Sequence, residues 1–117
     1  MPREKDLEVG LLLDFYGELL SPEKREAVRL YYDEDLSLAE IAGDTDITRQ
    51  GVRDRIEKAK SQLYTYEEKL GLAAKFREID MKLSVITARL ESLKDDVDER
   101  TSRELSAVIE EVRTITI

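Results

Sequence analysis

Cysteine and histidine are both absent from this sequence of 117 residues. Their absence excludes disulfides and thiolate or imidazole chemistry, and it argues against a structural zinc site. The five glycines stand singly, at positions 10, 17, 43, 51 and 71, so the chain has no glycine-rich cradle for a phosphate group. Neighbouring carboxylates such as Asp95-Asp96 do not converge across a pocket, as acid–base catalysis requires. We therefore expect no enzyme, no metal, no cofactor and no small-molecule substrate.

Proline and long apolar runs are also scarce. Only Pro2 and Pro22 occur, so no residue after Pro22 lacks the backbone N–H that a helix needs. No stretch approaches the roughly 20 apolar residues of a membrane span, and Met1–Glu8 lacks the apolar region of a secretory signal. We expect a cytoplasmic protein without membrane contact. Its 39% charged, 41% hydrophobic and 6% aromatic residues are typical of long, solvated helices.

The spacing of apolar residues predicts an all-α protein without a sheet. Ser21-Pro22 ends a first, leucine-rich helix and starts the second, because serine caps a helix and proline fits its first position. Gly71 fits the end of the fourth helix. The four helices are expected over Leu7–Leu20, Pro22–Tyr32, about Leu38–Ala42, and from the Thr48 cap to Leu70, with all of the first helix buried.

Residues Ser37–Ile56 carry the pattern of a helix-turn-helix motif. Ser37 and Glu40 form a capping box at the start of its first helix, and Thr48 caps the second helix after a short turn. Small and branched apolar side chains hold the two helices together from beneath, so the outer face of the second is free for a DNA groove. The residues expected to support the motif are Ser37, Ile41, Ala42, Ile47, Thr48, Val52 and Ile56.

Charge separates this second helix from the rest of the chain. Thr48–Gln62 holds five basic and two acidic residues, a net charge of +3, while the remaining residues sum to −11 in a chain of net charge −8. With Val52 inward, Gln50 and Asp54 point outward and are flanked by Arg49 and Arg53, and arginine can read guanine while glutamine can read adenine. More basic side chains are placed for phosphate. The predicted nucleic-acid contacts are Arg49, Gln50, Arg53, Asp54, Arg55, Lys58 and Lys60.

A family resemblance follows from these residues. Two segments resemble region 4, the last DNA-binding region, of bacterial sigma factors: Ser37-Leu38-Ala39-Glu40-Ile41-Ala42 and Ile47-Thr48-Arg49-Gln50-Gly51-Val52-Arg53-Asp54. A longer match over about Leu12–Leu72 is similar to the YlxM family. It consists of Asp14-Phe15-Tyr16-Gly17-Glu18-Leu19-Leu20, Leu30-Tyr31-Tyr32, Asp35-Leu36-Ser37-Leu38 and Tyr66-Glu67-Glu68-Lys69-Leu70-Gly71-Leu72. Gly51 and the Thr45-Asp46 turn depart from the common helix-turn-helix pattern.

The resemblance implies a sigma-region-4-like, winged-helix-like bundle whose gene accompanies that of the signal recognition particle GTPase. It therefore implies a regulatory protein that binds duplex DNA and takes part in the signal recognition particle pathway. A second hypothesis is an interaction module that binds this GTPase or its RNA without reading DNA sequence. The imperfect turn and the acidic remainder of the chain motivate it.

A coiled-coil-like seam follows Gly71, and we divide the chain into a helix-turn-helix domain, 1–72, and a helical extension, 73–117. We expect one long helix, a turn near Asp98–Ser102, and a shorter helix with apolar residues over Leu105–Ile115. The seam predicts a homodimer coil, an intramolecular hairpin or a partner-binding helix, because a lone helix cannot bury its stripe. Its expected self-association residues alternate at spacings of three and four: Phe76, Ile79, Leu83, Ile86, Leu90, Leu93 and Val97.

Overall fold

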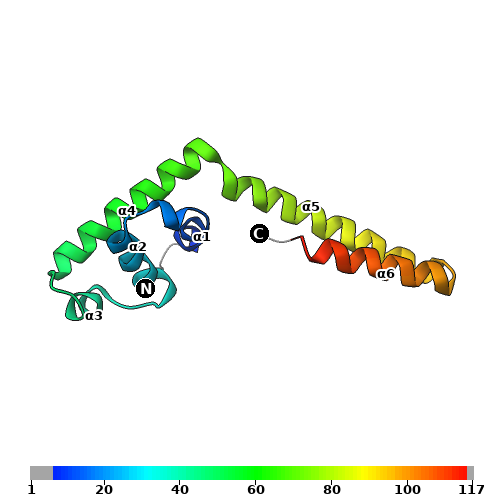
Figure 1. Ribbon diagram of the computed structural model, residues 1–117, viewed down its shortest axis with the longest axis horizontal. Helices are drawn as coiled ribbons and strands as arrows, with labels where there is room; N and C mark the ends of the chain where they lie inside the picture. Colours follow the sequence, from blue (N-terminus) through cyan, green and yellow to red (C-terminus); the bar gives the residue numbers. More distant parts are fainter. Residues whose placement is uncertain (1–6, 116–117) are drawn as a thin grey trace. The chain divides into compact units, whose positions relative to one another are not determined.

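The computed structural model describes residues 7–115, and in this part of the chain it contains six α-helices and no strand (Figure 1). The prediction of an all-α helix-turn-helix bundle is thus confirmed. The described residues form two compact units, divided between Ala73 and Ala74. None of these helices is long and apolar enough to cross a membrane. The helices are α1, Leu7–Tyr16; α2, Pro22–Val28; α3, Leu38–Gly43; α4, Arg49–Leu70; α5, Leu72–Leu93; and α6, Glu99–Arg113.

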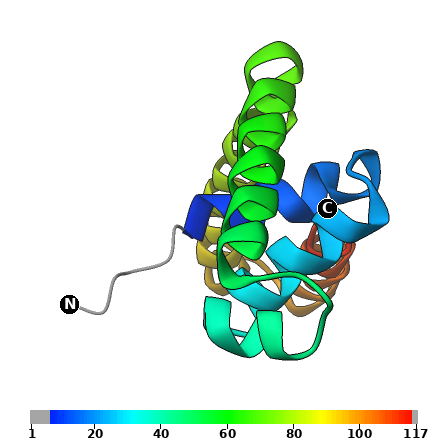
Figure 2. The same cartoon turned by 90° about the vertical axis from the view of Figure 1, so that its left-hand side faces the viewer.

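The first unit is built on α4, against which α1, α2 and α3 all pack (Figures 1 and 2). Helix α4 has 22 residues, so it is about 33 Å long. Its inward stripe takes part in two hydrophobic clusters, which hold α4 along its length. The first cluster consists of Val9, Leu12, Leu13, Tyr16, Leu20, Val28, Ala59, Leu63 and Ala73. The second consists of Ala27, Ile41, Val52 and Ile56.

Helix α1 is shorter than the segment Leu7–Leu20 predicted from the sequence. It ends at Tyr16, and a 3₁₀ turn, Gly17–Leu19, follows it. Leu7 and Leu19 are exposed, so the expected burial of the whole segment is wrong at these positions. The apolar residues surround the helix, but only the side that meets the first cluster can be buried.

Helix α2 begins as predicted and ends differently. Ser21 accepts a hydrogen bond from the Lys24 N–H at 3.3 Å, and Pro22 occupies the first helical position. Beyond Val28 the chain widens into a π-helical turn, Arg29–Asp33, where we had expected an α-helix to Tyr32. Backbone bonds close this segment, from Glu34 N–H to Arg29 C=O at 3.1 Å and from Leu36 N–H to Leu30 C=O at 3.0 Å.

Gly71 ends α4 in the way its position predicted. Its backbone is left-handed, with φ of 64°, and its N–H donates to Glu67 C=O at 2.8 Å. Glycine adopts this conformation without the strain that a Cβ would cause. Two side chains accept the first N–H groups of α5, directly after Gly71. Tyr16 Oη accepts from Leu72 N–H at 3.1 Å, and Glu67 Oε1 accepts from Ala73 N–H at 3.0 Å.

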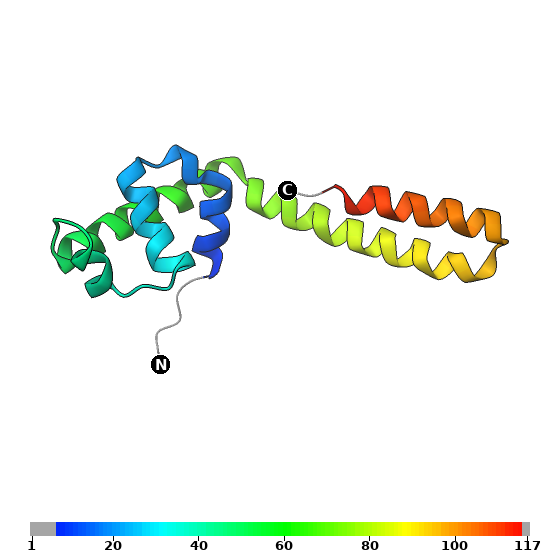
Figure 3. The ribbon, with the colours of Figure 1, turned by 60° about the horizontal axis from the view of Figure 1, so that its bottom comes forward.

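The second unit is a hairpin in which α5 and α6 run antiparallel, side by side (Figure 3). The turn lies earlier than the predicted Asp98–Ser102, which is a correction. A 3₁₀ turn begins at Lys94, and Val97 is extended, with φ of −129° and ψ of 168°. The reason is Asp98, whose side chain accepts from Thr101 N–H at 2.8 Å and so caps α6. Val97 is therefore no part of a continuous helical seam.

The residues of the predicted seam fall into two groups in this hairpin, one half-buried and one exposed. Phe76, Leu83 and Leu90, which follow one another at intervals of seven residues, are half-buried on α5. On α6, Ile109 is only 1% exposed. The alternate seam positions remain exposed on α5 or just after it, at Ile79, Ile86, Leu93 and Val97.

Candidate nucleic-acid interface

The first helix of the motif, α3, starts at a complete capping box. The Glu40 N–H donates to Ser37 Oγ at 3.1 Å, and the Ser37 N–H donates to Glu40 Oε1 at 2.8 Å. Each bond occupies a backbone donor that a helix start leaves without a partner. These reciprocal bonds fix the first residue of a helix only six residues long.

The turn between α3 and α4 depends on Thr45. Its hydroxyl donates to Ala42 C=O at 3.4 Å and accepts from Ile47 N–H at 3.4 Å, so one side chain joins the end of α3 to the approach of α4. The Thr45 N–H also donates to Ala42 C=O, at 3.2 Å. Among the described residues other than glycine, only Asp35 has a positive φ. The turn at Asp46 therefore needs no glycine, which explains this departure from the common pattern.

Helix α4 begins beside α3 (Figures 1 and 2). Thr48 caps it by accepting a hydrogen bond from Gly51 N–H at 3.0 Å. Gly51 itself has ordinary helical geometry, and a Cβ at this position would lie 3.4 Å from Ile47 Cβ and from Thr48 Oγ1. The interior glycine thus reflects no steric requirement of the fold.

The apolar residues of the motif lie beneath these two helices. Ile41, Val52 and Ile56 are at most 3% exposed and form the second cluster together with Ala27. Ala42 and Ile47 are half-buried and pack against the same cluster. This packing fixes the rotation of α4 about its own axis, and so decides which side chains face outward.

The outward ridge of α4 is polar. Gln50 and Asp54 are both exposed, and Gln50 Nε2 donates to Asp54 Oδ1 at 3.0 Å. Glu57 continues the ridge one turn further and is also exposed. The hydrogen bond orients the amide and the carboxylate, both of which can hydrogen-bond to base edges.

Basic side chains occupy the two flanks of this ridge. At 100° per residue, Arg49, Arg53 and Lys60 lie on one flank, whereas Arg55 and Lys58 lie on the other. Arg49, Arg53 and Lys58 are exposed, and Arg55 and Lys60 are half-buried. The structure thus places all seven predicted contact residues on α4, with the five basic residues divided between its two sides.

This division matches the geometry of a DNA major groove. The groove is about 12 Å wide and admits one α-helix, with a sugar–phosphate backbone on either side. A helix that enters it directs its ridge toward base edges and its flanks toward the two phosphate strands. Guanidinium and ammonium groups on both flanks suit those two strands.

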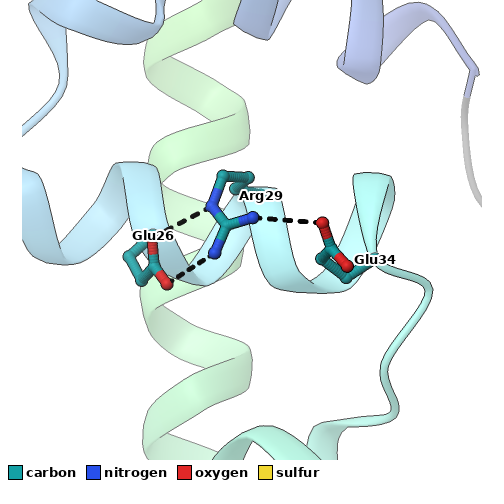
Figure 4. Close-up of polar contacts among 3 residues, drawn as sticks. All are labelled: Glu26, Arg29 and Glu34. Carbon is teal, nitrogen blue, oxygen red and sulfur yellow. Dashed lines mark hydrogen bonds and ion pairs between the residues drawn. The ribbon is translucent and has the colours of Figure 1, made fainter.

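Two features of the site are absent from the predictions made from the sequence. Lys24 Nζ donates to Gln62 Oε1 at 3.1 Å and ties α2 to the middle of α4 across 38 residues. Arg29 is held by carboxylates on both sides (Figure 4). Its Nε and Nη2 donate to Glu26 at 3.1 and 2.8 Å, and its Nη1 donates to Glu34 at 3.2 Å. No local sequence pattern indicates the first contact, whereas the spacing Glu26-x-x-Arg29 is one that pairs on a helix.

The contact between Arg29 and Glu26 shifts the pKa of both groups. The hydrogen bonds from Arg29 lower the pKa of Glu26 against the opposing effect of desolvation, and the charge of Arg29 adds to the lowering. The same hydrogen bonds and the charge of Glu26 raise the pKa of Arg29. Arg29 is therefore engaged within its own segment and is a poorer phosphate ligand than the arginines of α4.

These contacts define a helix-turn-helix protein, with α3 as the supporting helix and α4 as the recognition helix. A family model, UPF0122, with the description "Putative helix-turn-helix protein, YlxM / p13 like", matches residues 3–106. The chain belongs to this family. The match extends well past Leu72, where the resemblance seen in the sequence ended.

Relatives of similar length support this assignment. A UPF0122 protein of Halalkalibacterium halodurans is 43% identical over 113 residues, which is 96% of this chain and 97% of the relative. One from Thermoanaerobacter sp. strain X514 is 42% identical over 106 residues, 91% of this chain and 88% of its own. A third, from Bacillus cereus strain AH187, is 38% identical over 112 residues, covering 96% and 97%.

Proposed function

We propose that this protein binds duplex DNA through α4 and acts as a regulatory protein. The observation that carries the proposal is the arrangement of α4: a polar ridge of Gln50 and Asp54, between two basic flanks, on a helix whose rotation is fixed by buried Val52 and Ile56. Arg49 and Arg53 are the proposed base or phosphate contacts near the helix start, and Arg55, Lys58 and Lys60 are proposed phosphate contacts.

The acidic remainder of the chain is compatible with this function. Its net charge of −11 lies outside Thr48–Gln62, which carries +3. A field of this kind orients the protein as it approaches a polyanion, with the basic helix toward the phosphates. The proposed site of action, the signal recognition particle pathway in the cytoplasm, comes from the resemblance to the YlxM family and from no residue of this chain.

Fluorescence anisotropy with a labelled duplex tests the proposal. The wild-type chain is titrated at low and at physiological salt, beside Arg53→Ala and a matched control, Arg77→Ala, which removes an exposed arginine of α5. We expect binding that weakens steeply with salt, and a loss of about tenfold for Arg53→Ala alone. No binding at low salt, or equal losses in the two variants, would overturn the proposal.

The ridge of α4 also favours a second candidate, a module that binds the signal recognition particle GTPase or its RNA. Asp54 and Glu57 put two carboxylates at the most outward positions of α4, where they would repel the phosphates of a closely packed duplex. A protein or an RNA loop with exposed amino groups would accept them.

Purified components distinguish the two candidates. The chain is titrated in the same assay against the labelled GTPase, against the particle's RNA and against duplex DNA. Binding to the GTPase or RNA that Asp54→Ala weakens, without binding to DNA, would support the second candidate. Binding to neither the GTPase nor its RNA would exclude it.

A further inference from the structure

The α5–α6 hairpin has one apolar face that its own two helices leave exposed. On α5, Phe76, Leu83 and Leu90 are half-buried, as expected of the side that meets α6. Ile79, Ile86 and Leu93 each follow one of them by three residues, so they lie about 60° around the helix. They are 37 to 48% exposed, although their side chains are large and apolar.

Helix α6 adds to the same face. Ile109 marks its side toward α5, and Val108 is displaced from Ile109 by about 100° in the same rotational sense as the exposed residues of α5. Because the two helices are antiparallel, equal senses of rotation lead to the same face of the hairpin (Figure 3). Val108 is 44% exposed.

The opposite face of the hairpin is polar. Rotation in the other sense from the contact line leads to Asp80, Thr87 and Glu91 on α5 and to Ser106 and Arg113 on α6. Arg113 Nη2 and Glu91 Oε1 lie 3.4 Å apart on this side. The two broad faces of the hairpin thus differ, because Ile79, Ile86, Leu93 and Val108 gather on one of them and polar side chains on the other.

Charges of opposite sign border the apolar face. Along α5 the border is basic at every seventh residue, with Lys75, Lys82 and Arg89. Along α6 the border is acidic, with Glu104 and Glu111 seven residues apart. Lys82, Arg89 and Glu111 make no ion pair with any residue from 7 to 115.

We propose that a second copy of this chain covers the face, in a four-helix bundle whose two-fold axis runs parallel to the helices. This axis places α5 of each copy against α6 of the other, with all neighbouring helices antiparallel. The basic border of each α5 then meets the acidic border of the partner's α6. A two-fold axis across the helices would instead bring basic against basic and acidic against acidic, so charge selects the first arrangement.

A second copy fits this face better than an unrelated helix for the same reason. One hairpin carries both halves of the charge pattern, one on each helix, so the face is self-complementary under rotation. An isologous interface requires just this property. The inference is independent of DNA binding and does not rest on it.

The mass of the full-length chain in solution gives the first test. Size-exclusion chromatography with light scattering should give twice the 13.5 kDa of one chain. Ile86→Lys places a charge in the apolar face and should weaken the dimer about 100-fold. Ser84→Lys is the matched control, because Ser84 is exposed on the polar side of α5, away from the apolar face, and it should leave the mass unchanged. Circular dichroism shows whether both variants keep their helices.

Exchange of the border charges tests the direction of the two-fold axis. Lys82→Glu with Arg89→Glu should separate the copies, and so should Glu104→Lys with Glu111→Lys. All four substitutions in one chain, or an equimolar mixture of the two double variants, should restore the dimer. A monomeric wild-type chain would overturn the proposal, and so would a dimer that does not respond to the double substitutions. A variant with all four substitutions that stays helical but monomeric would exclude a two-fold axis parallel to the helices.

Discussion

The Tyr16 hydroxyl donates a hydrogen bond of 2.6 Å to Glu67 Oε1, across 51 residues of the chain. Both partners also accept backbone N–H groups at the start of α5, Tyr16 from Leu72 and Glu67 from Ala73. The pair therefore joins α1 to the last turn of α4 and supplies acceptors for two donors that the helix start leaves open. Tyr16 is 1% exposed, so little water can replace a partner that is lost.

Tyr16→Phe should lower the free energy of unfolding by about 1 to 3 kcal/mol, because it removes one of the donors to Glu67 and leaves the Leu72 N–H without its acceptor. Urea denaturation followed by circular dichroism measures the change. Tyr66→Phe is the matched control. Its hydroxyl makes an exposed contact of 3.4 Å with Leu19 C=O, and its loss should cost under about 0.5 kcal/mol. Equal losses in the two variants would contradict this role for Tyr16.

The stability of the fold should fall at alkaline pH because of the same residue. Burial raises the pKa of Tyr16 above 10.0, and the hydrogen bond to Glu67 raises it further. Because the pKa of Tyr16 is higher in the folded chain than in the unfolded chain, the neutral hydroxyl stabilises the fold. This stabilisation is complete below the unfolded pKa of about 10, and it is lost as pH rises from there through the folded pKa. Urea midpoints at pH 8 and above pH 10 should therefore differ more for wild type than for Tyr16→Phe. Parallel pH profiles of the two proteins would contradict the assignment.

Alanine substitutions at Gly51, inside α4, and at Gly71, at its end, should change the stability of the fold in opposite directions. Gly51→Ala adds a Cβ in ordinary contact distance and should stabilise the fold by about 0.5 to 1 kcal/mol, since alanine favours a helix interior. Gly71→Ala puts a Cβ at a φ of 64° and should cost about 1 kcal/mol or more. Thermal unfolding of the two variants compares them directly. A destabilised Gly51→Ala would show that this glycine serves the fold.

The two basic flanks of α4 should contribute separately to DNA binding. Arg53→Ala with Lys60→Ala removes charge from one flank, and Arg55→Ala with Lys58→Ala removes it from the other. Each pair should reduce the slope of log affinity against log salt by about 2 if every residue faces a phosphate. Anisotropy titrations over a series of salt concentrations give the slopes. If only one pair changes the slope, α4 contacts a single strand.

The ridge residue Asp54 should govern sequence preference more than affinity. Its carboxylate can accept from the N4 amino group of cytosine, and it repels phosphates. Asp54→Ala should therefore bind random duplex as tightly as wild type or more tightly, and select fewer cytosines at one position of a randomised duplex library. Sequencing of the selected duplexes measures this preference. An unchanged cytosine frequency would exclude Asp54 as a base contact.

Local signals in the sequence predicted the helices and the motif well. Ser21, Ser37 and Thr48 cap the helices that were expected to start there, and Gly71 ends α4 with the expected left-handed backbone. The inward stripe from Val52 to Leu63 is buried as its spacing predicted. These features depend on residues three or four apart, so a single sequence contains them.

Features that depend on distant residues were not predicted. The π-helical turn at Arg29–Asp33 and the contact between Tyr16 and Glu67 have no local sequence pattern. The sequence predicts the turn between α5 and α6 several residues too far along the chain. The polar run around Asp98 resembles a turn, although the Asp98 side chain in fact caps α6. The domain boundary at 72 and the roles of the seven α4 side chains stay predictions.

The length of α4 has a consequence for the thermodynamics of recognition. The proposed DNA contacts lie between Arg49 and Lys60, whereas Ala59 and Leu63, on the inward side of the helix, are buried in the first hydrophobic cluster. The recognition surface is therefore already ordered before any nucleic acid arrives, and binding includes no folding step. We expect the heat-capacity change of association to match the small apolar area of one helix in a groove, without the large negative value that accompanies coupled folding.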